Sequence, residues 1–284
     1  MNIASAIPGA GRPRSRLQYV RSMAFPFPQI RRLLIDLDGV MYRGNVALPH
    51  AHDFVHWLRE RDIQYRLVTN NATLTPVQYV EKLRKMGIDV GEDEFFTSAL
   101  ATALYLREQG ARGQAAFVIG EDGLVEALHE IGVRIHEGEV DWVVVGLDRH
   151  LTYDKLAGAA LKIGAGARFV GTNPDRSFPS ERGLVPGAGA LLAALSATTG
   201  IEPMVIGKPE PLMLQLAMIS LGSTIDDTAM LGDRLDTDIQ GAGALHMPSI
   251  LTLTGVSTKA DLERSRIQPT LVVEDLSQLM REWS

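Results

Sequence analysis

The chain has 284 residues, of which 45% are hydrophobic and 22% charged, and its formal net charge is −6. A chain of this length buries roughly 75% of its unfolded surface, enough for one large domain or two smaller ones. The acidic balance argues against a nucleic-acid-binding surface, the absence of cysteine excludes disulfides and thiolate metal sites, and no apolar run approaches the roughly 18 residues of a membrane span.

The first 29 residues differ from the rest of the chain. They carry four prolines and scattered arginines without a helical or strand period, which predicts a loosely ordered extension over residues 1–29. They contain no apolar core of a signal peptide. Together with the missing cysteines, this favours a cytoplasmic location.

The first predicted strand is the apolar run Leu33-Leu34-Ile35-Asp36-Leu37-Asp38, with Gly39 as its exit. Side chains alternate along a strand, so Asp36 and Asp38 project from the same side. Like charges this close favour a bound cation or one protonated carboxyl group, and a hard divalent metal such as Mg2+ takes oxygen ligands. The alternative is a surface loop built from ordinary turn residues.

Apolar runs and helical patterns then alternate along the chain. A helix opens at Pro49, a strand covers Gln64 to Val68, and a capping box at Thr75-Pro76-Val77-Gln78 starts a helix that stops at Gly87. Further strands are predicted over 117–120, 142–147, 168–171, 204–206, 228–231, 249–253 and 271–273, with a helix over 212–221 and a loop over 173–187. This alternation predicts an α/β protein with parallel sheets, and the strands are too many for one small sheet. We expect two α/β layers, one inserted into the other.

The polar residues that suggest chemistry share one position, because each follows the last residue of a predicted strand. Asp36 and Asp38 follow the first strand, Thr69 follows the second, and Lys208 and Asp233 follow later ones. In an open parallel sheet these strand ends meet at one crevice. We therefore expect the five residues to share one site.

The residue types at these strand ends suit a phosphate ligand. Thr69 offers a hydroxyl donor, the amides of Asn70 and Asn71 lie in a loop where an anion can bind, and Lys208 is a point charge. Taken singly, each has a simpler explanation, because most polar residues are merely exposed.

The segment Gly232-Asp233-Arg234-Leu235-Asp236-Thr237-Asp238 carries three carboxylates within six positions at a strand-to-helix turn. Such a group completes an oxygen-ligand shell or caps the following helix. We predict that Asp233 is a metal ligand and that Asp238 acts on the metal through a water molecule. No role is assigned to Asp236.

In this order, the segments Asp36-Leu37-Asp38-Gly39-Val40, Thr69-Asn70-Asn71, Gly207-Lys208-Pro209 and 232–238 resemble the four motifs of the haloacid-dehalogenase (HAD) superfamily of phosphohydrolases. The branch that the chain most resembles is NagD-like, of the para-nitrophenyl-phosphatase type. This resemblance implies a Rossmann-like core formed by residues 30–96 and 201–284, with an α/β cap domain inserted over 97–200.

The resemblance also implies a mechanism. Asp36 would be the nucleophile that forms an aspartyl phosphate, and Asp38 the general acid and base. Mg2+ would be held by the Asp36 carboxylate, the Asp38 backbone carbonyl and Asp233, with Asp238 behind them.

The same resemblance gives Thr69, Asn70, Asn71 and Lys208 the role of binding the phosphoryl oxygens. Such a division suits phosphoryl transfer, which depends on positioning and on neutralising charge.

A small phosphorylated metabolite is the expected substrate, and the polar cap loop from Asn173 to Arg182 is the candidate contact for its leaving group. Within this loop, Asp175, Arg176, Glu181 and Arg182 are either substrate contacts or solvated charges. Two other functions stay open, a dehalogenase on the same fold and a non-enzymatic phosphate-binding module. A homodimer is an expected assembly, through an exposed sheet edge or apolar patch.

Overall fold

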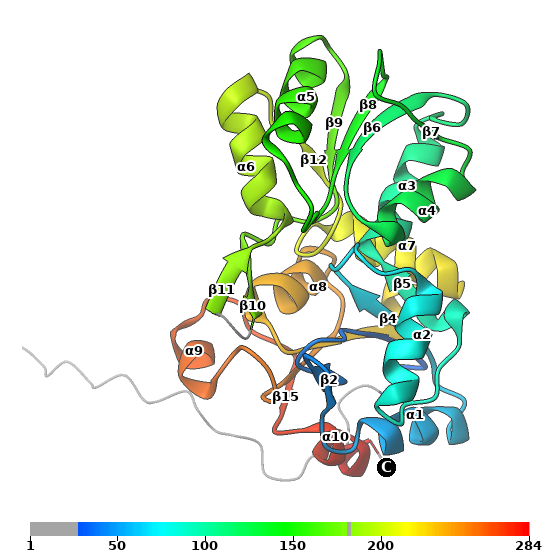
Figure 1. Cartoon of the computed structure of the whole chain (residues 1–284). Coiled ribbons are helices and arrows are strands. Elements are labelled where there is room, and N and C mark those ends of the chain that lie inside the picture. Colours follow the sequence, from blue (N-terminus) through cyan, green and yellow to red (C-terminus); the bar gives the residue numbers. More distant parts are fainter. Residues whose placement is uncertain (1–27, 181–182, 284) are drawn as a thin grey trace, which may run out of the picture.

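Two parallel sheets organise this chain, whose computed structural model describes residues 28–180 and 183–283. One sheet has six strands in the order β15-β14-β13-β1-β4-β5, and the other has five in the order β12-β9-β8-β6-β7. All pairings within these two sheets are parallel, and the two sheets lie in different halves of the molecule (Figure 1). The predicted α/β fold is confirmed. The extension predicted over residues 1–29 falls outside the described residues except for its last two.

The six-stranded sheet and its helices form what we call the larger unit. Leu33, Leu34 and Ile35 of the central strand are completely buried, as expected for a parallel strand covered on both faces. Helices α1 (Ala51–Glu60), α2 (Pro76–Lys85) and α10 (Leu276–Glu282) pack on one face, and α7 (Pro211–Leu221) and α8 (Gln240–Ala244) on the other. The strands are β15 (Leu271–Val273), β14 (Ser249–Thr252), β13 (Thr228–Gly232), β1 (Arg32–Ile35), β4 (Gln64–Thr69) and β5 (Phe95–Thr97).

The five-stranded sheet and its helices form the smaller unit. Helices α5 (Tyr153–Gly164) and α6 (Ala188–Thr199) pack on one face, and α4 (Asp122–Glu130) packs on the other together with α3 (Ser98–Glu108). The strands are β12 (Met204–Val205), β9 (Arg168–Gly171), β8 (Trp142–Val145), β6 (Ala115–Ile119) and β7 (Arg134–Ile135). The inserted domain was predicted to end at residue 200, and in the structure the next strand, β12, pairs with β9 of the smaller unit.

The two units share one hydrophobic cluster. It contains Leu34 of β1 in the larger unit and Val144 of β8 in the smaller unit, and helices α3 and α7 connect them. The alternate residues Leu33 and Val143 belong to separate clusters on the outer faces of the two sheets. The units are therefore joined by packed side chains, and we propose that residues 98–205 form the inserted cap.

The remaining elements are short. The segment predicted as a loop over 173–187 contains an antiparallel hairpin, in which Phe178 is opposite Val185 and Gly183 has a φ of 109°. Its prolines suggested a loop, but a two-stranded ribbon leaves one side of each strand unpaired and tolerates them. Figure 1 shows this hairpin projecting from the smaller unit towards α9. The short elements are β2 (Tyr42–Arg43), β3 (Val46–Ala47), β10 (Ser177–Ser180), β11 (Gly183–Pro186), α9 (Lys259–Arg264) and the helical turns η1 (Glu92–Glu94), η2 (Ile225–Asp227) and η3 (Leu235–Ile239).

Within the ranges that the structure describes, no helix combines the length and the apolar character needed to cross a membrane.

Candidate active site

Three carboxylates meet at the carboxyl end of the larger sheet. Asp36 follows β1 and Asp233 follows β13, its neighbour in the sheet, while Asp238 lies in the helical turn η3 after β13. One oxygen of each lies within 4.8 Å of an oxygen of the other two. Asp233 and Asp238 are 0% and 1% exposed. Parallel strands that end at one level thus bring together carboxylates almost 200 positions apart.

Lys208 supplies the positive charge inside this group. Its ammonium nitrogen lies 2.6 Å from Asp36 Oδ1 and 2.7 Å from Asp238 Oδ1, and it donates to the Val68 carbonyl at 3.2 Å. Burial lowers the pKa of Lys208, but the charges of Asp238 and Asp36 outweigh this and raise the pKa above its usual value. The lysine is therefore a fixed cation that holds Asp36 in place.

One ammonium group does not balance three buried carboxylates. Burial raises the pKa of Asp36 well above its usual value, Lys208 opposes this, and the charges of Asp238 and Asp233 add to it. Burial and the Asp238 charge raise the pKa of Asp233 to about 7. The arrangement therefore favours further positive charge at this position, as protons or as a cation.

The ligand atoms available here suit a hard divalent metal. All three side chains offer carboxylate oxygens, the ligands that Mg2+ prefers. Asp233 Oδ2 accepts a hydrogen bond from the Val256 amide at 2.6 Å, whereas the buried Asp233 Oδ1 has no hydrogen-bond partner among the described residues. A buried carboxylate oxygen without a partner is costly, and a bound cation would satisfy it.

Asp38 lies beside this group rather than in it. Its side chain is exposed, and its backbone begins a tight turn in which the Gly39 amide donates to the Tyr42 carbonyl at 2.8 Å. Gly39 has a φ of 91°, and a Cβ there would lie 2.4 Å from an Asp233 oxygen. Burial raises the pKa of Asp38, and the charges of Lys82 and Arg43 lower it. The turn leaves this carboxyl group accessible at the rim of the site.

The three residues after β4 differ in their placement. Thr69 and Asn70 are 6% and 9% exposed, and Asn70 Nδ2 donates to the Lys208 carbonyl at 2.8 Å. The Asn71 side chain does not join this group, because its Oδ1 accepts hydrogen bonds from the amide and the hydroxyl of Thr73 at 2.9 and 2.8 Å. The Asn71 amide donates to Thr69 Oγ1 at 3.2 Å. Of the three, Asn70 is the residue that bonds to Lys208.

The loop after β14 also shapes the site, and the sequence did not predict it. A Cβ at Gly255 would lie 1.8 Å from Asp233 Oδ2, and the Ser257 amide donates to the Asp233 carbonyl at 3.1 Å. The Thr254 hydroxyl donates to the Gly39 carbonyl at 2.6 Å. This loop therefore fixes both Asp233 and the turn that carries Asp38. A glycine two positions after the strand predicted over 249–253 was the available signal.

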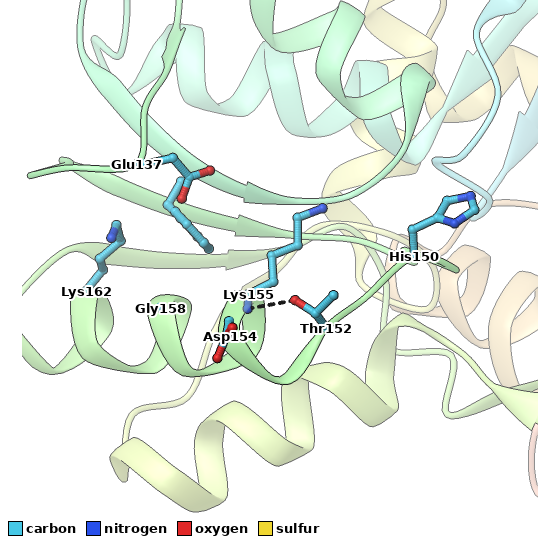
Figure 2. A pocket seen from close by; sticks show the side chains of 8 residues that line it. Glu137, His150, Thr152, Asp154, Lys155, Gly158 and Lys162 are labelled. Atoms are coloured by element: carbon cyan, nitrogen blue, oxygen red, sulfur yellow. Dashed lines mark hydrogen bonds between the residues drawn. The ribbon is translucent and has the colours of Figure 1, made fainter.

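Two surface hollows lie away from this group. One, of about 310 Å³, is on the smaller unit between α5 and the side chains of Phe117 and Glu137 (Figure 2). Its Lys155 ammonium already pairs with the buried Asp148 at 2.5 Å. The other, of about 490 Å³, lies between α2 and α4. Neither is lined by a predicted site residue.

Comparisons with known proteins place this chain among phosphatases. Residues 33–134 match the family model of haloacid dehalogenase-like hydrolases, and residues 205–279 match that of HAD-hydrolase-like proteins. The chain is 45% identical over 255 residues to an acid sugar phosphatase of Staphylococcus aureus, an alignment that covers 89% of this chain and 98% of that protein.

Similar solved structures are also phosphatases. A 4-nitrophenylphosphatase from Thermotoga maritima has a TM-score of 0.86 and 35% identity, over 90% of this chain and 98% of the other. A glycerol phosphate phosphatase from Mycobacterium tuberculosis, in complex with magnesium, has a TM-score of 0.83 and 35% identity, over 88% of this chain and 76% of the other.

Proposed function

This chain belongs to the haloacid dehalogenase superfamily, in its NagD-like, para-nitrophenyl-phosphatase-type branch of phosphoric monoester hydrolases, and we propose that it hydrolyses small organic phosphate monoesters with Mg2+. The observation that carries the proposal is the buried group of Asp36, Asp233 and Asp238 around the Lys208 ammonium. A buried site with excess negative charge suits a divalent cation and a phosphate brought in together.

Asp36 is the proposed nucleophile. Its Oδ1 is held by Lys208 at 2.6 Å, which stabilises the ionised form that attacks. In the first step an Asp36 oxygen forms a bond to phosphorus while the bond from phosphorus to the ester oxygen breaks. The product is an aspartyl phosphate and a leaving alcohol. Burial opposes the ionised form, so the cationic neighbours are essential to this role.

Asp38 is the proposed proton carrier. Its carboxyl group lies two positions beyond the nucleophile at the accessible rim of the site, and partial desolvation there raises its pKa, so that it holds a proton more readily. Asp38 would give this proton to the leaving oxygen and then take one from the water that attacks the aspartyl phosphate. The second step releases inorganic phosphate and restores the Asp36 carboxylate.

The metal would be held by the Asp36 carboxylate, the Asp38 backbone carbonyl and Asp233, with Asp238 acting through a water molecule. When bound, Mg2+ neutralises charge on the phosphoryl oxygens. Thr69, Asn70, Asn71 and Lys208 are proposed to bind the same oxygens. For Asn71, only its backbone amide is suited to this, because its side chain is bonded to Thr73.

The substrate is proposed to be a small phosphorylated metabolite, supported by relatives that are a sugar phosphatase and a glycerol phosphate phosphatase. A homodimer is also part of the proposal, supported by Tyr153 and Leu161 of α5, which are 83% and 76% exposed. Sedimentation of the purified chain tests it. A cytoplasmic location stays a prediction from the absence of cysteine.

A panel of phosphate esters tests the function. Purified protein is assayed for phosphate release from p-nitrophenyl phosphate, glycerol phosphate and hexose phosphates, with Mg2+ and after dialysis against a chelator. We expect turnover of several esters with Mg2+ and loss of turnover after chelation. Full activity without metal would contradict the role of Mg2+. Halide release from a haloacid without phosphate release would identify a dehalogenase, and retention of phosphate without turnover would identify a binding module.

A further inference from the structure

The smaller unit contacts the candidate site through the segment after β9. Asn173 Nδ2 donates to the Asn70 carbonyl at 2.7 Å, and Asn70 Nδ2 donates to Asp175 Oδ2 at 3.1 Å. Asn70 directly follows Thr69 at the end of β4. Residues of the inserted unit therefore bond to both the backbone and the side chain of a residue predicted to bind phosphate.

These bonds determine the orientation of Asn70. The two neighbours of its Nδ2, the Asp175 carboxylate and the Lys208 carbonyl, both accept hydrogen bonds, so the amide nitrogen must face them. The Asn70 carbonyl accepts from Asn173 and also from the Ser98 hydroxyl at 2.5 Å. With its side chain and its carbonyl both bonded, Asn70 is held in place, and the peptide between Asn70 and Asn71 is fixed from the side of the smaller unit.

Packing around this contact leaves little room for another arrangement. A Cβ at Gly207 would lie 2.7 Å from both Asn70 Oδ1 and the Thr172 carbonyl oxygen. A Cβ at Gly189, near the start of α6, would lie 2.2 Å from the Pro174 carbonyl oxygen. The start of helix α6 thus packs against the segment after β9 on one side, and Asn70 and Gly207 pack against it on the other.

Asp175 is rigidly placed for this purpose. Its amide donates to Asn173 Oδ1 at 3.1 Å, and its carbonyl accepts from the Gly189 amide at 2.9 Å. Burial raises the pKa of Asp175, while the Asn70 hydrogen bond and the charges of Arg234 and Lys208 lower it. The carboxylate therefore lies among residues of the larger unit's site and acts there as a hydrogen-bond acceptor.

We infer that Asp175 is a positioning residue, which holds Asn70 so that the loop after β4 is correctly shaped for the phosphoryl group. This inference rests on the proposed function. It differs from the expectation that the polar loop after Asn173 contacts the leaving group. A residue that acts through Asn70 affects the binding of the phosphoryl group, which all substrates have in common. Loss of Asp175 must therefore lower kcat/KM for every ester, and weaken the binding of inorganic phosphate, by a similar factor.

Two substitutions separate the hydrogen bond from the charge. Asp175→Leu keeps the approximate shape and removes the acceptor, and an apolar residue of similar volume is often tolerated at a buried charged position. Asp175→Asn keeps an acceptor oxygen for Asn70 and removes the charge. Asp154→Asn is the matched control, because Asp154 is an exposed carboxylate on α5 of the same unit.

The full chain with Mg2+ is assayed with p-nitrophenyl phosphate and a hexose phosphate, and inhibition by inorganic phosphate is measured. We expect Asp175→Leu to lower kcat/KM for both esters by about 10- to 100-fold, because misplacement of a binding group costs on this scale. Inhibition by phosphate should weaken in parallel. Asp175→Asn should stay within about fivefold of the parent, since its oxygen accepts the same hydrogen bond, and Asp154→Asn should match the parent.

Three results would overturn the inference. In the first, Asp175→Leu has the parent's kinetics. In the second, one ester is affected, the other is not, and phosphate inhibition is unchanged, which makes Asp175 a leaving-group contact. In the third, Asp175→Leu does not fold, and the folded Asp175→Asn weakens inhibition by phosphate by the full amount, about 10- to 100-fold, expected for loss of the Asn70 hydrogen bond. The charge of Asp175, not the hydrogen bond, would then be decisive. If the parent itself hydrolyses no ester, the proposed function fails. If the parent is active and the Asp175 variants have the same kinetics, only the role of Asp175 is refuted.

Discussion

Both sheets have buried carboxylates beyond the ends of their strands, but these carboxylates differ in how many partners the protein gives them. In the smaller unit, Asp148 follows β8, and its oxygens receive the Lys155 ammonium at 2.5 Å and the His150 amide at 2.8 Å. In the larger unit, Asp36 and Asp238 share the single ammonium of Lys208, and Asp233 Oδ1 has no hydrogen-bond partner in the described part of the chain. Asp148 therefore has its own partners within the protein, whereas the three carboxylates of the larger unit have too little positive charge among them.

This difference separates a structural ion pair from a candidate site. A buried charge with its own partner stabilises a local arrangement and needs nothing more. A cluster of carboxylates with too little positive charge stays costly until a ligand brings charge in, and such costs are concentrated at functional sites. The following predictions test the contrast, from the largest expected effect to the smallest.

Asp36→Asn should have the largest effect. The amide is not nucleophilic, so we expect kcat/KM for p-nitrophenyl phosphate to fall at least about 1,000-fold. Folding should be retained, because the amide has nearly the same shape and Lys208 keeps Asp238 as a partner. Circular dichroism and steady-state kinetics measure the two quantities, and a substantial residual rate would contradict the nucleophile assignment.

Asp233→Asn should affect the metal more than the fold. We expect about 100-fold lower kcat/KM at a fixed, low Mg2+ concentration, with partial recovery as Mg2+ is raised. The metal-free variant should be no less stable than the parent, since the substitution removes one of three like charges. A Mg2+ titration of activity and a urea unfolding curve provide the test. An unchanged Mg2+ requirement would remove Asp233 from the metal site.

The metal-free protein should lose stability as the pH rises. Asp233 has a pKa of about 7 in the folded state, above its ordinary value of 3.8. Between these values the folded state binds more protons than the unfolded state, so the free energy of unfolding falls with increasing pH. Asp36 contributes in the same direction. Melting temperatures from pH 4 to 8 should show this decline without metal, a smaller decline for Asp233→Asn, and stabilisation by Mg2+ at the upper end. A flat profile without metal would show that the carboxylates are already balanced.

Asp148→Asn, in the satisfied pair, should leave activity within about twofold of the parent, because Asp148 touches no site residue. The free energy of unfolding should fall by about 1–2 kcal/mol, since a charged hydrogen bond is lost while Lys155 stays partly solvated. Urea unfolding and the p-nitrophenyl phosphate assay measure the two effects. A large loss of activity would show that the smaller sheet's strand ends also serve the reaction.

The sequence predicted the parts of this protein that depend on local patterns. The apolar run before Asp36 forms β1 and is buried on both faces, and the capping box at Thr75 and Gln78 starts α2. The family was also recognised, because its four motifs are short contiguous segments. The roles of the site residues stay predictions, although the structure brings Asp36, Lys208 and Asp233 together.

Other features were beyond a reading by pattern. The contact of the 254–257 loop with Asp233 links positions more than 20 residues apart, and no local periodicity encodes it. The hairpin β10–β11 was hidden by its prolines. The Asn71 side chain was grouped with Thr69 and Asn70 by sequence adjacency, but a local turn to Thr73 uses its oxygen.

By itself, the sequence determined which residues carry charge, where the strands end, and which family the chain resembles, because these properties are written in short stretches of neighbouring residues. Only the tertiary structure decided that Asp36, Asp233 and Asp238 share one lysine while Asp148 has its own, and that Asp175 of the smaller unit bonds to Asn70 of the larger. The physical reason is that the balance of buried charge and the orientation of an amide depend on which groups lie within a few ångströms, and that follows from the packing of the two sheets.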